Sequence, residues 1–518
     1  MKKFLSLASI CLALTFTSCE DFLSVSSPDE LTTGNYWRDE SDALAGLASA
    51  YSQLYHGDTY ATSEVRWPTE EYRADIVNLG RDAGNYDQWV ALYNFTYTNG
   101  NTQMSYYYQD LYRGINFANQ VIANVPNIPA EEIDESARNT ILEEAHFLRG
   151  YYHLMLLLNW EKIIIRDEYI TETAQLNKPL SERNACWDFV ISELEQATGL
   201  PTERTVEELG RATSGAAYAY IGLAYLTRAY EETTQKDAYL TEAANALRQV
   251  INSGAYSLVS GENLINMFNG TNKNCSESIF EVQYSASEAN GSVHYSYINQ
   301  WIGATELGGW DEILPSDMLM EEYMKEGVKA DGLYDNRLYN TIYYQCDYFN
   351  DGTGNVLGGH EYNDLFCEFD DDGNPKPGTE YNRPVFRKFT SPTQEEMWES
   401  CDFNIPLMRY SNVLLMMAET LNEQGQTSEA IPYINEVRTV HGGMEGIAEN
   451  SSYDAVKAQI EHERILEFPL EGYRWFDMRR WGVTAERLQA AGRTGYDDSK
   501  AFYPIPKWET DANPEAQQ

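Results

Sequence analysis

Apolar residues recur with a helical period along most of this chain, and this pattern constrains its fold more than any other feature. In ILEEAHFLRGYYHLMLLLNW, residues 141–160, the positions that share one helical face are Ile141, Ala145, Leu148, Tyr152 and Met155. The preceding segment, YYYQDLYRGINFANQVIANV, repeats the pattern as far as Val125. Because Pro126 and Pro129 separate the two segments, we predict an antiparallel pair of helices.

Further helices are predicted at residues 40–56, 183–199, 214–233 and 238–253. One of them contains GAAYAYIGLAYL, residues 215–226, in which Ala and Gly alternate with large apolar residues. Small residues let paired helices cross closely, and large ones fill the gaps, as in tetratricopeptide repeats. We therefore predict a mainly α protein with a tetratricopeptide-like scaffold of helical hairpins.

The helical period fades between about residues 255 and 400, where Gly, Asn, Asp and Pro become frequent. The fragments SIFEVQYS and RPVFRKF predict short strands between turns. FDDDGNPKPG, residues 369–378, has the carboxylate density of a calcium loop, but its acids are consecutive and no glutamate closes it. We interpret it as a turn and expect an irregular, loop-rich cap without a bound metal.

Helices resume in NIPLMRYSNVLLMMAETLNEQGQTSEAIPYINEVRTVHGG, where Gly425 separates two periodic runs into a hairpin. The chain thus divides into a signal peptide at 1–18, an N-terminal helical region at 19–255, the cap at 256–400 and a C-terminal region at 401–518 that completes the scaffold.

The N-terminus has the form of a targeting signal. Lys2 and Lys3 precede an apolar stretch of 13 residues, Phe4 to Phe16, which is shorter than the about 20 residues of a membrane-spanning helix. Thr17 and Ser18 suit a cleavage site, and Cys19 follows them. This arrangement resembles the bacterial lipoprotein signal, in which the cysteine is acylated, and acyl chains anchor a protein without a helix. The alternative is an ordinary signal peptide with a chance cysteine.

Charge and aromatic content limit the classes of ligand. The chain has 37 basic and 80 acidic residues, so its net charge of −43 repels nucleic acid and anionic lipid and excludes nucleic-acid binding. It also has 38 Tyr and 11 Trp. Such a surplus often lies on binding surfaces, and flat rings with polar edges suit sugars and peptides.

Cysteine spacing gives no disulfide framework. Beyond the signal, the cysteines other than Cys19 form an odd set without a CxxC motif: Cys186, Cys275, Cys346, Cys367 and Cys401. Because Cys346 and Cys367 lie in one loop-rich region, they are the pair we would test first for a disulfide.

Several segments together resemble the SusD/RagB family. The C-terminal ones are NIPLMRYSNVLLMMAETLNEQG, AIPYINEVR, IEHERILEFPLEGYRWFDMRRWG and FYPIPKWETDANPEAQQ. Earlier in the chain, NYWRDESDALAGLASAYSQLY, EEAHFLRGYYHLMLLLNW, GAAYAYIGLAYL and DNRLYNTIYY follow in the order expected of the family. The resemblance therefore covers the whole mature chain. One departure is Pro469, which predicts a kink or break after Phe468.

This resemblance implies a glycan-binding outer-membrane lipoprotein, anchored by lipid at Cys19 and facing the cell exterior. Glu20 and Asp21 resemble the acidic signal that sends some lipoproteins to that surface. Such proteins have no catalytic residues and no cofactor. They capture oligosaccharides, or peptides in the RagB-type branch, and form a lid on a SusC-like TonB-dependent outer-membrane barrel. The rival class from the residues alone is a helical glycosidase, but no carboxylate pair stands out among the acids.

The resemblance places the ligand against two segments, EVRWPTEEYRAD and NQWIGATELGGWDE. Their aromatic candidates are Trp67, Tyr72, Trp301 and Trp310, with Trp89 and Tyr86 as weaker ones, and the polar candidates are Arg66, Arg73 and Asp75. Because polar or small residues flank the first four rings, we expect them to be more exposed than Trp160 or Trp187. The alternative is that Trp67 and Trp301 fill the seam between helices and cap.

A charged cluster near the C-terminus could be mistaken for catalytic carboxylates. Its members are Glu463, Glu467, Glu471, Arg474, Arg479 and Arg480. At these spacings they predict a salt-bridge ladder on one helix. Paired arginines hold carboxylates ionised rather than ready to donate a proton, so we assign the cluster to the scaffold.

Overall fold

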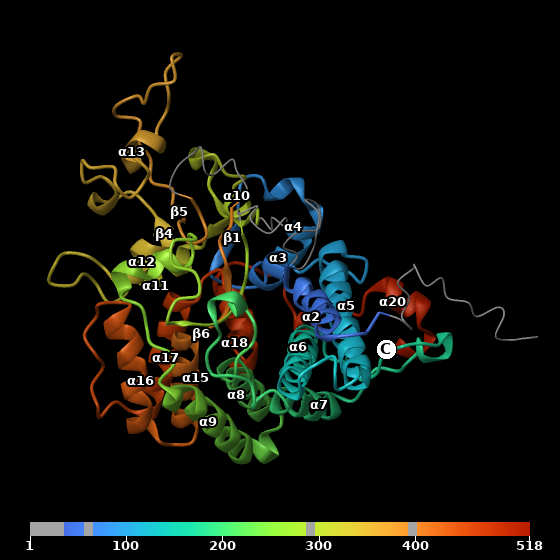
Figure 1. Ribbon diagram of the computed structural model, residues 1–518. Coiled ribbons are helices and arrows are strands. Elements are labelled where there is room, and N and C mark those ends of the chain that lie inside the picture. Colours follow the sequence, from blue (N-terminus) through green and yellow to red (C-terminus); the bar gives the residue numbers. More distant parts are fainter. Residues whose placement is uncertain (1–35, 56–65, 286–295, 392–400, 518) are drawn as a thin grey trace, which may run out of the picture.

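The computed structural model describes residues 36–55, 66–285, 296–391 and 401–517, and in these it is mainly helical. Nine helices form one curved layer in which neighbours in space follow one another along the chain (Figure 1). They are α2 (Glu40–Ser52), α5 (Thr102–Asn124), α6 (Glu135–Asn159), α7 (Arg183–Glu195), α8 (Ser214–Glu231), α9 (Lys236–Ser253), α15 (Tyr410–Glu423), α16 (Thr427–Val440) and α17 (Tyr453–Glu467). The predicted helices of the N-terminal region are confirmed.

The hairpin of α5 and α6 shows how the sequence forms this layer. Asn101 caps α5 by accepting from the amides of Gln103 and Met104, and a short turn that contains Pro126 ends it. A Cβ on Gly114 of α5 would lie 2.4 Å from the ring of Tyr152 on α6, so only glycine permits this approach. Gly222 of α8 plays the same part against Leu247 of α9. The predicted role of small residues at helix crossings is confirmed.

The C-terminal region differs from the prediction at its start. Residues Ile405–Arg409 form strand β6 instead of the first turn of a helix, and α15 begins only at Tyr410. Proline is tolerated in the first turn of a helix, so Pro406 does not decide between the two structures. The pairing of this segment with β2 (Ser278–Val282) does. Gly425, at φ +75°, separates α15 from α16 as predicted.

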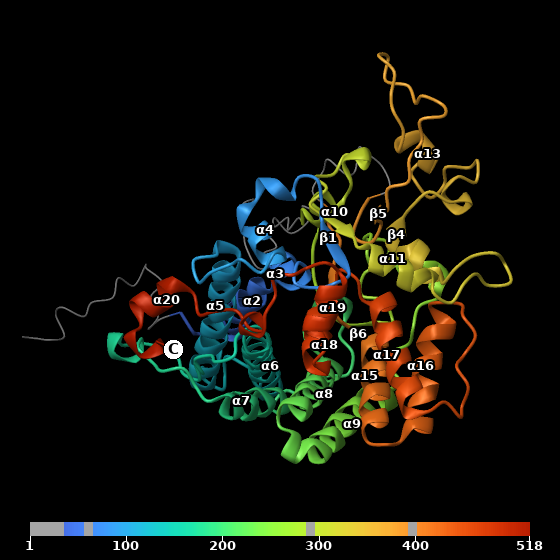
Figure 2. The same cartoon turned by 180° about the vertical axis from the view of Figure 1, so that it is seen from behind.

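The predicted break at Pro469 is confirmed, because α17 ends at Glu467 and Phe468 is its C-cap. Shorter helices follow: α18 (Arg474–Trp481), α19 (Thr484–Ala490) and α20 (Lys507–Ala512) (Figure 2). No helix in the described part of the chain is both long and apolar enough to cross a membrane. Cys19 lies outside the described residues.

Between α9 and α15 the chain is irregular, as predicted. Its elements are β2, α10 (Ile298–Ile302), β3 (Ile313–Pro315), α11 (Asp317–Met324), α12 (Asn336–Thr341), β4 (Ile342–Tyr343), α13 (Tyr362–Leu365) and β5 (Val385–Phe386). The predicted strands in SIFEVQYS and RPVFRKF are β2 and β5. Asp370 accepts from the amides of Asp372 and Asn374, so FDDDGNPKPG forms the predicted turn.

None of the five cysteines in the described residues forms a disulfide. Cys346 and Cys367 are therefore not bridged. The two lie in the same loop-rich part of the chain, but sequence proximity does not bring their sulfur atoms to bonding geometry.

One strand pair joins the segment after α3 (Arg66–Glu71) to the segment after α10. β1 (Val77–Leu79) follows α3 and pairs antiparallel with β3, with Asn78 opposite Leu314. In both views β1, α10 and α4 (Asp87–Tyr93) lie together on the side of the helical layer away from α9 (Figures 1 and 2). The pair thus brings the segments after α2 and after α10 to one place.

Candidate functional site

The β1–β3 pair places aromatic rings from both of these segments in one cluster. We call the following residues the aromatic cluster: Trp67, Tyr72, Tyr86, Trp89, Tyr297, Trp301 and Trp310. Trp89 of α4 links the two sides, because its ring centroid lies 5.2 Å from that of Trp67 and 5.0 Å from that of Trp301. The ring centroids of Trp301 and Trp310 in turn lie 4.4 Å apart. All six rings predicted from the sequence therefore meet.

The base of the cluster is buried, so Trp67, Tyr72 and Trp301 are hardly more exposed than Trp160 and Trp187, which are both 0% exposed. The exposed fractions of the first three are 8%, 0% and 4%. These rings pack against one another, which covers their faces even though their sequence neighbours are polar or small. Their burial agrees with the alternative that Trp67 and Trp301 fill the seam between helices and cap. Trp160 and Trp187 are buried, as expected.

The rim of the cluster is partly exposed and consists of Tyr86, Tyr297 and Trp310. Tyr86 stacks on Trp89 at 4.3 Å, and Tyr297 lies nearly parallel to Trp310 at 6.3 Å. Tyr297 was not among the predicted residues, although it lies two positions before the segment NQWIGATELGGWDE. The rim rings can offer flat apolar surface to a ligand over a rigid aromatic base.

A polar network borders this rim. Arg81, whose side chain is 50% exposed, pairs with Glu306 at 2.9 Å and donates to Thr305. Arg383 pairs with both Glu306 and Asp311, and the hydroxyl of Tyr381 donates to Glu306. Sequence reasoning missed these residues because they come from three separate segments. The network can supply hydrogen bonds beside the rings.

The predicted polar residues belong to the scaffold instead. Arg73 is fully buried, donates to Thr69 and Asn159 and lies over the ring of Tyr503. Asp75 accepts two hydrogen bonds from Arg474, at 2.8 and 2.7 Å. Arg66 is partly buried and pairs with Glu70. Because Arg73 and Asp75 bind to partners within the helical body, neither enters the ligand site proposed below.

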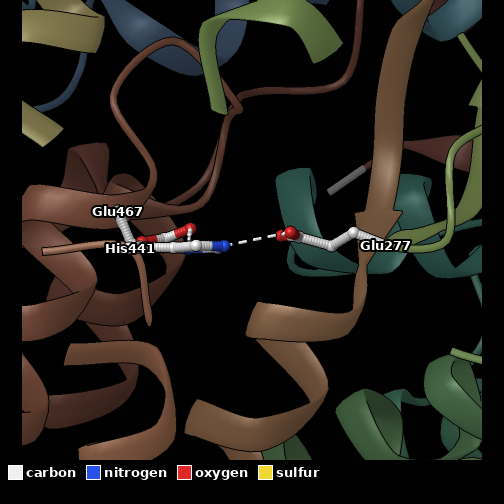
Figure 3. A group of neighbouring side chains, drawn as sticks. All are labelled: Glu277, His441 and Glu467. Atoms are coloured by element: carbon white, nitrogen blue, oxygen red, sulfur yellow. Dashed lines mark hydrogen bonds and ion pairs between the residues drawn. The ribbon is translucent and has the colours of Figure 1, made fainter. Parts of the chain in front are cut away.

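A second cluster has the composition of a metal site. Ligand atoms of Glu277, His441 and Glu467 lie within 4.8 Å of one another, and all three residues are buried (Figure 3). His441 Nδ1 lies 2.9 Å from Glu467, and Nε2 lies 3.0 Å from Glu277. Both ring nitrogens are thus hydrogen-bonded to carboxylates.

The position of a cation in this cluster is taken by a guanidinium. Arg409 Nη1 lies 2.5 Å from Glu277 and 2.9 Å from Glu467, and its Nε donates to Glu471. A metal ion between these carboxylates would be repelled by Arg409 at close range. We therefore assign the group to a buried ion-pair network.

Burial and charge set the ionisation of this network. Burial alone would lower the pKa of His441, but the carboxylates of Glu277 and Glu467 overcome it and raise the pKa to about 9. Burial would raise the pKa of Glu467, but His441 and Arg409 hold it well below its usual value. The network is therefore ionised at neutral pH.

The predicted charged cluster at residues 463–480 is structural, but it is not a ladder on one helix. Glu463 pairs with Arg337 and Arg438, Glu471 with Lys388 and Arg409, Arg474 with Asp75 and Arg480 with Glu419. Arg479 donates to two backbone carbonyls. Because the helix ends at Glu467, the acids and arginines no longer share one helical face, and each finds a partner on another element.

A pH profile tests this network. The pKa of His441 is near 6.5 in the unfolded chain and about 9 in the folded one. The stability that protonated His441 gives to the fold is therefore complete below pH 6.5 and is lost as the pH rises through 9. We expect His441→Gln to be less stable than the wild type by about 3 kcal/mol at pH 6, with a difference that shrinks towards pH 9.5. Urea unfolding at several pH values measures it, with the exposed His360→Gln as control. Parallel profiles for wild type and His441→Gln would contradict this assignment.

A groove of about 350 Å³ lies elsewhere, between α2 and residues 209–211. Its lining is mainly apolar and includes Leu44, Tyr51, Leu209 and Val282, and it contains no member of the aromatic cluster. It is a competing place for a ligand.

Two family models match the chain. The model described as SusD family matches residues 276–518, and the one described as starch-binding associating with outer membrane matches residues 21–226. A relative from Formosa agariphila, SusD-like protein P38, is 25% identical, with 94% of this chain and 93% of the relative covered. A SusD-like protein from Bacteroides ovatus is 23% identical over 90% of this chain and 81% of its own.

Solved structures share the fold. A SusD superfamily protein from Bacteroides vulgatus has a TM-score of 0.77 at 24% identity, covering 93% of this chain and 99% of that one. Surface glycan-binding protein A from Bacteroides thetaiotaomicron, solved with laminarihexaose, has a TM-score of 0.69 at 20% identity, covering 91% of this chain and 97% of that one. The two matched models together cover most of the chain, and the chain belongs to the SusD-like family.

Proposed function

We propose that this protein captures oligosaccharides on the rim of the aromatic cluster. The observation that carries the proposal is the set of partly exposed rings, Tyr86, Tyr297 and Trp310, beside the polar network of Arg81 and Glu306. Sugar rings stack on aromatic faces, and their hydroxyls bond to neighbouring polar groups. Support also comes from relatives whose names describe laminarin binding or a complex with laminarihexaose.

A screen of purified protein against oligosaccharides and peptides tests this function. Calorimetry should give saturable binding to an oligosaccharide and none to peptides, and the bound oligosaccharide should keep its length. Peptide binding alone would favour the RagB-type importer. Shortened products would favour a glycosidase.

Delivery of the ligand to a SusC-like TonB-dependent barrel completes the proposed function. The matched family description, which mentions association with the outer membrane, supports this location. Co-purification of a large barrel from gently solubilised native membranes is the expected result. A monodisperse monomer in such extracts would count against the partner.

Anchoring through Cys19 is a separate prediction. The short apolar stretch before Cys19 and the residues Thr17 and Ser18 support acylation at that cysteine. We expect Cys19→Ala to leave the membrane fraction or to remain uncleaved, because acyl chains would supply the attachment. Fractionation and mass spectrometry of the N-terminus measure this. Membrane retention of a cleaved Cys19→Ala protein would refute it.

A further inference from the structure

Glu312 has an unusual environment for a carboxylate beside the aromatic cluster. Glu312 is 2% exposed, and its Oε2 has no hydrogen-bond partner within the described residues. Its backbone is fixed, because its amide donates to Trp301 and its carbonyl accepts from Gly80 and from the hydroxyl of Tyr72. Buried polar atoms without a partner are rare, and each calls for an explanation such as a missing ligand.

The backbone beside Glu312 is held in a strained turn. Asp311 has a φ of +56°, in the left-handed region that side chains other than glycine seldom adopt. A Cβ on Gly80 would lie 1.7 Å from the carbonyl oxygen of Asp311, so this close approach requires glycine. Strain of this kind concentrates at functional sites. The turn at Asp311 fixes Glu312 two positions after the rim residue Trp310.

The charged groups that act on Glu312 are acidic. Burial raises the pKa of Glu312 to about 8, and the nearby carboxylates of Asp82 and Asp311 add to the rise. Arg383 and Arg81 are engaged by Glu306 and Asp311. Glu312 itself forms no ion pair within the described residues.

We propose that Glu312 and its acidic surroundings determine ligand specificity: the site accepts uncharged oligosaccharides and rejects those that carry carboxylate or sulfate groups. The inference rests on the proposed function and names its ligand class. The carboxylates of Asp82 and Asp311, which lie close enough to Glu312 to raise its pKa, would repel an anionic sugar near Trp310. A protonated Glu312 can instead donate a hydrogen bond to a sugar hydroxyl.

Binding to matched oligosaccharides tests the ligand class. The panel pairs neutral hexasaccharides, laminarihexaose among them, with uronate and sulfated oligosaccharides of the same length, at one ionic strength. We expect capture of neutral members only. Equal or tighter capture of anionic members would overturn this inference while the proposed function stands. Capture of no oligosaccharide would overturn both.

A pH titration then tests Glu312 itself. At pH 9 a carboxyl with a pKa of about 8 is about one-tenth protonated, so affinity for a neutral ligand should fall about tenfold between pH 6.5 and 9. Glu312→Gln cannot ionise and should remove this fall. Glu321→Gln, an exposed acid on α11, should keep it. Asp82→Asn should move the fall to lower pH, because one neighbouring negative charge is gone.

Either of two outcomes would refute the role of Glu312. The first is a pH-independent wild-type affinity, and the second is a fall that persists unchanged in Glu312→Gln. Thermal unfolding of each variant at both pH values shows that the folded protein is being compared. If Glu312→Gln fails to fold, the shift in Asp82→Asn decides.

Discussion

Replacing Arg409 with methionine should destabilise the fold by about 3–5 kcal/mol, because breaking a buried ion pair leaves charges without a partner. Arg409 is 1% exposed and contacts the carboxylates of Glu277, Glu467 and Glu471. Its guanidinium also lies over the ring of Phe468. These contacts join β6 to the residue before β2, to the end of α17 and to the turn that follows α17.

Urea unfolding of Arg409→Met measures this cost, and Arg38→Met is its matched control. Arg38 pairs with Asp42 at 2.7 Å, but its side chain is 63% exposed. Exposed pairs contribute about 0–1 kcal/mol, so the control should be nearly neutral. Should Arg409→Met not fold, Arg409→Lys, which keeps the charge but loses the forked geometry, should fall between it and the wild type. Equal stability of Arg409→Met and Arg38→Met would contradict a role for the network in the fold.

Two tryptophans of the aromatic cluster should respond in opposite ways. Trp301 is buried among Tyr86, Trp89 and Trp310, so Trp301→Ala should cost about 3–5 kcal/mol of stability. Trp310 is only partly buried, so Trp310→Ala should leave the melting temperature nearly unchanged and cost about 2 kcal/mol or more of binding. This corrects the sequence expectation that both rings are exposed anchors.

Thermal unfolding and calorimetric titration separate the two effects. Trp508→Ala, an exposed tryptophan on α20, serves as the control and should change neither quantity. If Trp310→Ala unfolds as readily as Trp301→Ala, the ring belongs to the core. If it binds with unchanged affinity, the rim is not the ligand site.

The helical layer could be predicted from the sequence because each helix is specified by residues that are close together in the chain. The period of the apolar residues identified each hairpin, and Pro126, Gly425 and Pro469 marked where helices end. The strand β6 was missed because its partner β2 lies far along the chain. Residues Ile405–Arg409 are apolar enough to suit either structure, and only the pairing decides.

The candidate site shows the same limit. The resemblance identified the two segments, but it could not show that β1 pairs with β3 or that the rings would bury one another. Exposure depends on contacts that the flanking residues do not encode. Likewise, the sequence identified Glu467 as a scaffold acid but not its link through His441 to Glu277. His441 and Glu277 are 164 positions apart in the sequence. Charge alone cannot identify such partners.

The location of the ligand is tested most directly by a crystal structure with the oligosaccharide that binds best in the screen. We predict a sugar ring stacked on Trp310, Tyr297 or Tyr86, with hydroxyls within hydrogen-bond distance of Arg81 or Glu306. An oligosaccharide in the groove between α2 and residues 209–211, with the rim of the aromatic cluster empty, would contradict the proposed site.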